Sequence, residues 1–415
     1  MPGVSGTQRS LSRCMQRPFS AKAGLRFGAC SGWSAILPLK GDPLAGHLVG
    51  ALEGSLSFSQ DFSHGEDNMK TRPERFSFRI YVLFILALLV ALLACITTGS
   101  VSISLKDTLS AIFHSFCGLE VPPGIPQNII LNVRLPRVLN VALMGAALSL
   151  CGAAMQGLLR NPLADGSTLG VSSGAALGAV LALAGGLRIP GSAYGGTMLM
   201  AMIFAFLSLL LILSLAYALD RSLATDSIIL IGVIFSMFAS SLITLVISFA
   251  GERVRSITFW TMGSLSSTGY PHAGLLALAL LVCGSIILRY AGELNAFALG
   301  EESARHMGVH VKRVKLILLV TVSVLIGVCV SIGGTIGFVG LAMPHMARMA
   351  AGPNHRRLLP LSMFSGAIFL LLADLLARTL LSPIELPIGV VTSLVGAAAF
   401  VLIFYRTRKA GQPRC

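Results

Sequence analysis

Residues 80–98, IYVLFILALLVALLACITT, form a continuous apolar run that contains no charged side chain. A helix that crosses a bilayer needs roughly 20 mostly apolar residues in a row. About ten runs of this kind lie between residues 80 and 405. These runs are continuous and do not alternate as the strands of a barrel do, so they predict helices. We therefore expect an all-α, polytopic membrane protein of about ten transmembrane helices.

The expected spans cover residues 80–98, 138–158, 168–187, 197–218, 227–250, 273–290, 315–333, 336–350, 360–381 and 388–405. The eighth is too short to cross straight and predicts a partial or tilted helix. If the segment before Ile80 is cytoplasmic, the connections on that side hold about 18 Lys and Arg residues, against about 6 on the other side. This asymmetry predicts that both ends of the chain are cytoplasmic.

The composition also favours a lipid environment. Of the 415 residues, 54% are hydrophobic and 12% are charged, and the mean hydropathy is +0.82. Soluble domains usually carry about a quarter charged residues. The net charge of +14 does not indicate nucleic-acid binding, because Lys and Arg lie in short segments between the apolar runs. The eight cysteines show no CxxC or Cys/His ligand spacing, so we expect no metal site and no disulfide framework. We also expect no cofactor.

Residues 1–68 differ from the rest of the chain. They are rich in Gly and Ser and contain no apolar run long enough to span a membrane. Met69 is followed by Lys70, Thr71 and Arg72 and then by the first span, which is how many membrane chains begin. We interpret residues 1–68 as a disordered tail or an untranslated extension, and residues 69–415 as the transmembrane domain.

The connection after the second expected span contains Gln156 and then Asn161-Pro162-Leu163-Ala164-Asp165. Pro162 predicts the end of one helix, and Asn161 can satisfy its open carbonyl groups. A tight turn without further function explains this segment equally well.

The connection between the sixth and seventh spans predicts a short helix bounded by glycines. Glu301, Ala304 and Arg305 fall on one face of this helix, and Gly308 can end it. Such a helix, with small residues on one face, suits docking into a groove of another protein. A solvated loop helix is the alternative.

Two further segments place unusual residues within the spans. Gly337 and Pro344 predict a broken helix, and His345 is either a ligand or proton relay or a hydrogen-bonded helix end. Asp374 and Arg378 are four residues apart on one helical face and can form an ion pair. Ionisable groups inside a membrane are candidates for function, but a structural ion pair is an equally good interpretation of Asp374.

These segments together resemble the FecCD-type permease subunits of bacterial ABC importers for iron–siderophore complexes, haem and vitamin B12. The resemblance runs from about residue 80 to residue 406 and excludes residues 1–68. It is carried, in order along the chain, by Arg134-Leu-Pro-Arg137, residues 156–170, Leu299–Gly308, Gly337–Arg348, Ala373–Arg378 and Glu385–Gly389.

The resemblance implies a ten-helix subunit in the bacterial inner (plasma) membrane, working as a homodimer or with a paralogue. Two cytoplasmic ATP-binding-cassette ATPase subunits would power it, and a periplasmic or surface substrate-binding protein would deliver the cargo. The coupling helix in the ATPase groove would use Leu299, Gly300, Glu301, Ala304, Arg305 and Gly308. The remaining motif residues would be structural or act in gating: Gln156, Asn161, Pro162, Gly337, Pro344, His345, Asp374, Glu385 and Pro387.

In the family, arginines that match Arg134, Arg137 and Arg378 engage glutamates of the binding protein. The charge pattern agrees, because these arginines lie on the outer face, against the positive-inside trend. We expect all three to be exposed there and ready to receive carboxylates. In the alternative interpretation, Arg137 only anchors a helix end and Arg378 only pairs with Asp374.

The expected mechanism is alternating access driven by the partner ATPases. The chain lacks a GxxxxGK(S/T) phosphate loop, so ATP hydrolysis is expected on a separate subunit and the chain itself is not expected to be an enzyme. Ferric siderophore is the expected cargo, with haem and cobalamin as alternatives. Two rivals stay open: a secondary transporter driven by ions through Asp374, Glu385 and His345, and a membrane enzyme that uses His345 and Asp374.

Overall fold

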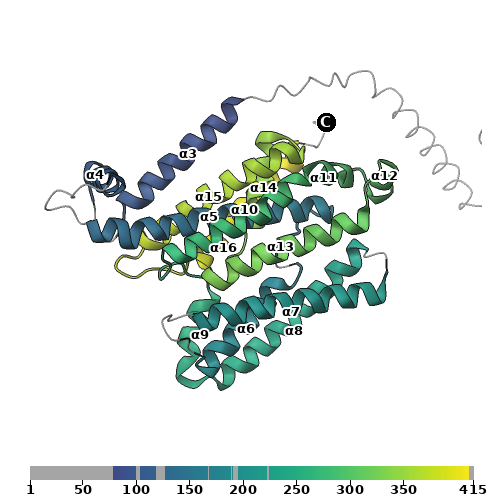
Figure 1. Cartoon of the computed structure of the whole chain (residues 1–415), viewed down its shortest axis with the longest axis horizontal. Helices are drawn as coiled ribbons and strands as arrows, with labels where there is room; N and C mark the ends of the chain where they lie inside the picture. The colour runs from purple at the N-terminus through teal and green to yellow at the C-terminus, as the bar shows by residue number, and fades with distance from the viewer. Residues whose placement is uncertain are drawn as a thin grey trace, which may run out of the picture. The chain divides into compact units, whose positions relative to one another are not determined.

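A computed structural model describes residues 78–99, 103–117, 127–166, 168–187, 189, 195–221 and 224–410. The interpretation of residues 1–68 lies outside these ranges. The regular elements of the described residues are helices. This arrangement confirms the predicted all-α class (Figure 1).

Seven helices are long and apolar enough to cross a membrane. They are α3 (Phe78–Thr97), α5 (Leu135–Leu158), α7 (Gly195–Leu219), α8 (Thr225–Phe249), α10 (Tyr270–Arg289), α13 (Val311–Gly333) and α15 (His355–Thr379). A π-helical segment, η2 (Ile129–Arg134), precedes α5 and lengthens that span. Three further helices, α6 (Val171–Gly185), α14 (Val339–Ala351) and α16 (Ile388–Ala410), occupy the other expected spans.

The predicted weakness of the eighth span is confirmed. With 13 residues, α14 is about 20 Å long and does not reach across a bilayer of about 30 Å. It begins after Phe338, whose φ of 67° lies in the left-handed region, and it contains Pro344. The backbone therefore turns back inside the bundle, where other helices cover it.

Short helices mark the two ends of the bundle (Figure 1). One end carries α4 (Leu105–Phe116) and α9 (Val254–Thr261), which follows the short segment η3 (Gly251–Arg253). The other end carries α11 (Ala291–Ala298) and α12 (Glu301–His306). We call these the α9 end and the α12 end.

The centre of the bundle is α5, which packs against α10, α13, α14 and α15. Two glycine pairs allow the closest approaches. A Cβ atom on Gly152 would overlap the backbone of Gly340, and one on Gly145 would overlap the backbone of Gly366. Small residues bring helices together in lipid in this way, so the glycines hold α14 and α15 against α5.

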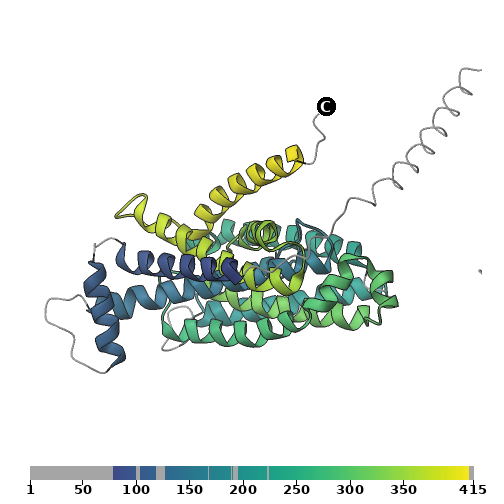
Figure 2. The ribbon, with the colours of Figure 1, turned by 90° about the horizontal axis from the view of Figure 1, so that it is seen from above.

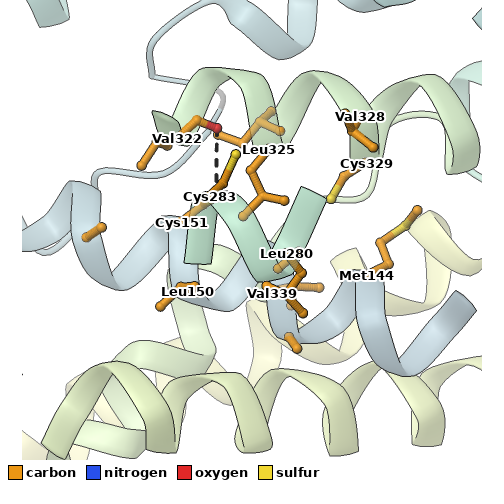
Figure 3. Packing of buried hydrophobic residues seen from close by; sticks show 14 of the residues in the cluster. Met144, Leu150, Cys151, Leu280, Cys283, Val322, Leu325, Val328, Cys329 and Val339 are labelled. Carbon is orange, nitrogen blue, oxygen red and sulfur yellow. Dashed lines mark hydrogen bonds between the residues drawn. The ribbon is translucent and has the colours of Figure 1, made fainter. Parts of the chain in front are cut away.

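The cysteines in the described core are free thiols and behave as small hydrophobic side chains. Cys151, Cys283 and Cys329 pack among Met144, Leu150, Leu280, Leu325, Val328 and Val339 (Figure 3). The Cys151 thiol donates a weak hydrogen bond to the carbonyl of Val322, with 3.8 Å between sulfur and oxygen. This contact joins α5 to α13.

Candidate functional site

An ion network joins three segments at the α9 end. Arg137, near the start of α5, lies 2.9 Å from Asp374 Oδ1 through Nη2 and 2.9 Å from Glu385 Oε2 through Nη1. Arg378 Nε lies 3.0 Å from Asp374 Oδ2, which confirms the expected pair within α15. The Asp374 side chain is only 1% exposed, whereas that of Glu385 is 46% exposed. Asp374 is thus the buried centre of the network, and Glu385 is its accessible edge.

Arg134 and Arg378 cap the C-terminal end of α3. Arg134 Nη1 donates to the carbonyls of Ile96 and Thr97, at 2.8 and 3.0 Å. Arg378 donates through Nη2 to the carbonyl of Cys95, at 3.1 Å, and through Nη1 to that of Thr98. Cations at a helix C-terminus satisfy its open carbonyl groups and complement its dipole.

The expectation that Arg134, Arg137 and Arg378 are exposed is wrong for this conformation. Their exposed fractions are 5%, 9% and 7%. Each guanidinium lies against partners within its own chain, because α3, α5 and α15 converge at this end. Pro387 lies two residues after Glu385 and directly before α16. Its carbonyl accepts a hydrogen bond from Val390 N.

At the α12 end, Gly300 and Gly308 bound the short helix α12, as predicted. Their φ angles of 111° and 84° lie in the region that favours glycine. Leu299 is 69% exposed, and Arg305 is also exposed. Ala304, in contrast, is fully buried.

Glu301 anchors α12 to the bundle instead of facing outward. Its Oε1 lies 2.6 Å from Nζ of Lys315 in α13 and accepts a hydrogen bond from Thr225 Oγ1 at 3.1 Å. Lys315 is 0% exposed, and Thr225 is the first residue of α8. The expectation that Glu301, Ala304 and Arg305 share one outward docking face is therefore wrong. Glu301 instead links α12 to α8 and α13.

The turn after α5 differs in one detail from the expectation. The helix ends at Leu158, before Pro162, as predicted. However, Asn161 Oδ1 accepts a hydrogen bond from Leu163 N at 2.9 Å and does not donate to the helix carbonyls. Its role is to fix the turn, as asparagine does in an Asx turn.

Gln156 compensates for the proline inside α14. Pro344 has no N–H group, so the carbonyl of Gly340, four residues earlier, lacks its helical donor. The side-chain amide of Gln156 donates to the carbonyls of Gly340 and Leu341, at 3.3 and 3.2 Å. Arg348 Nη2 approaches Gln156 Oε1 at 3.5 Å. The side chain of Gln156 thus holds the broken helix against α5.

We expect Gln156→Leu to destabilise the protein by about 1–3 kcal/mol, because two partly buried carbonyls lose their donor. Thermal unfolding in detergent measures this effect. Ser149→Ala is the matched control on α5, because the buried hydroxyl of Ser149 has no hydrogen-bond partner. Adding Pro344→Ala supplies a new N–H group to the carbonyl of Gly340. The double variant should therefore lose less stability than the sum of the losses in the two single variants. Strict additivity would contradict this role of Gln156.

Two other predicted site residues near α14 lie at a cavity and in an aromatic contact. Gly337 lines a cavity of about 360 Å³ between α13, α14 and α16, with Asp165, Ser172, Thr335 and Ser393 as polar neighbours. His345 is half-buried, and its ring lies 6.2 Å from that of Phe400 in α16.

Sequence reasoning overlooked His355 at the start of α15. Its backbone N donates to Asn295 Oδ1 at 2.8 Å, and its Nδ1 lies 2.9 Å from the same oxygen. Asn295 Nδ2 in turn donates to Asn354 Oδ1 at 3.0 Å. This contact fixes α11 to α15.

Comparisons with known proteins agree with this architecture. The model of the FecCD transport family matches residues 86–406. The chain is 42% identical to the ABC transporter permease protein YvrB of Bacillus subtilis, over 80% of this chain and 95% of the relative. It is 36% identical both to the molybdate import permease MolB of Haemophilus influenzae and to the hemin transport permease HmuU of Yersinia pestis. Those matches cover 80% of this chain and 97% and 98% of the relatives.

A solved structure is also similar. It is an inward-facing conformation of a metal-chelate type ABC transporter, with 33% identity and a TM-score of 0.69. The match covers 79% of this chain and 99% of that chain.

Proposed function

Since the chain belongs to the FecCD transport family and is an ABC importer permease, we propose that it moves ferric siderophores across the bacterial inner membrane by alternating access. The observation that supports alternating access driven by a partner is the position of α12. This short helix exposes Leu299 and Arg305 at one end of the bundle, while Glu301 ties it to α8 and α13. A partner that moves α12 therefore pulls directly on two membrane helices.

We place the α12 end and both termini in the cytoplasm. The connections at this end are basic, with Arg160, Arg221, Arg289, Lys312 and Arg313 among their residues. Excess Lys and Arg in short loops favours the cytoplasmic side. Separate ATP-binding-cassette subunits then dock on α12 and supply the hydrolysis, for which the sequence has no phosphate loop.

The α9 end then faces the binding protein. Docking there requires the ion network to open, because Arg137 is engaged by both Asp374 and Glu385. Glu385 is its exposed edge, so a carboxylate of the binding protein can replace it beside Arg137. Arg134 and Arg378 donate to main-chain carbonyls and keep the end of α3 in place.

A second copy of the chain, or a paralogue, completes the pathway. The cavity beside Gly337 holds only about 360 Å³, at the lower end of the roughly 300–1,000 Å³ of ordinary small-molecule pockets. A bulky metal complex needs more room than this cavity provides. The C-terminal half of α16 stands away from the bundle (Figure 2), and Leu394, Val401 and Leu402 on this helix are exposed. We propose that α16 and the cavity face the partner permease.

Uptake into proteoliposomes tests the cargo and the machine together. The liposomes contain the chain with its co-purified ATPase and binding protein, and the probes are labelled ferric siderophore, hemin and cobalamin. We expect ATP-dependent uptake of the siderophore alone. Uptake of hemin or cobalamin instead changes only the cargo. Uptake that follows a proton gradient without ATP contradicts the proposal and supports an ion-coupled transporter.

A further inference from the structure

A second, larger cavity opens at the α12 end and has no role in the proposed transport path. It has a volume of about 1110 Å³ and lies between the end of α10, α11, the start of α13 and the start of α15. Its apolar lining includes Leu288, Ala296, Val309, Val314 and Pro360. Three arginines, Arg289, Arg313 and Arg356, line it together with one carboxylate, Glu293. The cavity thus combines apolar walls with an excess of positive charge.

Two of these arginines end apolar stripes on the outside of the bundle. Arg289 shares one face of α10 with Val282 and Leu278, at spacings of seven and eleven residues. These two apolar side chains are 48% and 60% exposed. Because α10 is a membrane-spanning helix, its exposed apolar face is suited to lipid chains.

The second stripe lies on α13, which packs against α10. Arg313 shares a face with Leu316, Val320 and Val324, at spacings of three, seven and eleven residues. Their exposed fractions are 45%, 37% and 42%. Both stripes therefore lead from the apolar surface of the bundle to a guanidinium group at the mouth of the same cavity.

The three guanidinium groups are available for a ligand. All three arginines are exposed, and among the described residues none forms an ion pair with a carboxylate. The Arg356 guanidinium lies over Gly292 of α11, where a Cβ atom would be 3.6 Å from Nη2. Guanidinium groups bind phosphate oxygens through paired, charge-assisted hydrogen bonds. An anionic phosphate matches this charge excess.

We propose that the cavity binds the headgroup of an anionic phospholipid from the leaflet at the α12 end. Its phosphate lies among Arg289, Arg313 and Arg356, and its acyl chains lie along the exposed stripes of α10 and α13. The continuity of these stripes with the arginines favours a membrane lipid over an acidic segment of a protein partner. Because α11 forms one wall of the cavity, the bound lipid also restrains the segment that carries α12.

Native mass spectrometry of the intact transporter complex, purified from membranes that contain phosphatidylglycerol and phosphatidylcholine, tests this site. We expect about one phosphatidylglycerol to be retained per permease chain. Arg289→Gln/Arg313→Gln should reduce this occupancy about tenfold, because it removes two of the three guanidinium groups that bind the phosphate. Lys312→Gln/Arg221→Gln is the matched control, because it removes the same charge from exposed residues outside the cavity lining. This control should retain the lipid.

Equal retention of phosphatidylcholine, or equal losses in the two double variants, would overturn the proposal. If the cavity variant does not assemble, Arg356→Gln alone alters an exposed side chain and should still lower occupancy about threefold. A photoreactive residue at Met307, which lines the cavity, identifies the occupant directly. A lipid adduct supports the proposal, whereas an adduct with the ATPase subunit assigns the cavity to a protein contact.

Discussion

Glu301→Ala is expected to reduce ATP-dependent uptake more than tenfold while ATP hydrolysis by the partner subunits continues. The substitution removes the carboxylate that lies 2.6 Å from Nζ of Lys315, a side chain that is 0% exposed. Removing one partner of a buried ion pair destabilises a protein by about 3–5 kcal/mol, because the remaining charge stays buried. The link from α12 to α8, through Thr225, is lost in the same step. Movement of α12 then no longer reaches the membrane helices.

Glu302→Ala is the matched control for this prediction. It removes the same charge from the adjacent, exposed position of α12 and should leave uptake and thermal stability near those of the wild type. Glu301→Ala/Lys315→Met removes both charges and should recover most of the lost stability. If uptake stays low in this stable double variant, the pair acts in coupling. If uptake returns together with stability, the pair is only structural, and the proposed link is wrong.

The spans were predictable because continuous apolar runs leave a chain in lipid few alternatives. The expected run at 197–218 became α7, Gly195–Leu219, and the shortest expected span became α14. The start of α5 was less predictable. The expected span began at residue 138, whereas the π-helical segment η2 extends the helix back to Ile129. Polar residues such as Asn132 and Arg134 interrupt the apolar pattern there, so hydropathy alone does not include them.

The partners of the charged residues were harder to predict, because they depend on tertiary contacts. The Asp374–Arg378 pair follows from its spacing of four residues. Nothing local indicates that Arg134 reaches the carbonyl of Ile96, 38 residues earlier. Lys315 gave a usable signal, since it stands at the start of an apolar run and needs a carboxylate when buried. Finding Glu301 as that carboxylate required the turn between α12 and α13 to be known.

Asp374→Ala is expected to give the largest loss of stability at the α9 end, about 3–5 kcal/mol. Asp374 is 1% exposed and contacts both Arg137 and Arg378. After its removal, Arg137 keeps Glu385, but Arg378 keeps only main-chain acceptors near the end of α3. The charge of Arg378 then remains buried without a carboxylate, and the packing of α3 against α15 weakens. Thermal unfolding in detergent measures this loss.

Two further variants separate a buried charge from a general loss of contacts. Glu385→Ala removes a carboxylate whose side chain is 46% exposed, and solvent screening limits its effect to about 1 kcal/mol or less. Asp374→Leu/Arg378→Met removes the buried pair together and leaves Arg137 with Glu385, so it should recover most of the stability lost in Asp374→Ala. Equal losses for Asp374→Ala and Glu385→Ala would contradict a network centred on Asp374. Such a result would mean that Glu385, the edge exposed to a docking protein, also holds this end of the bundle together.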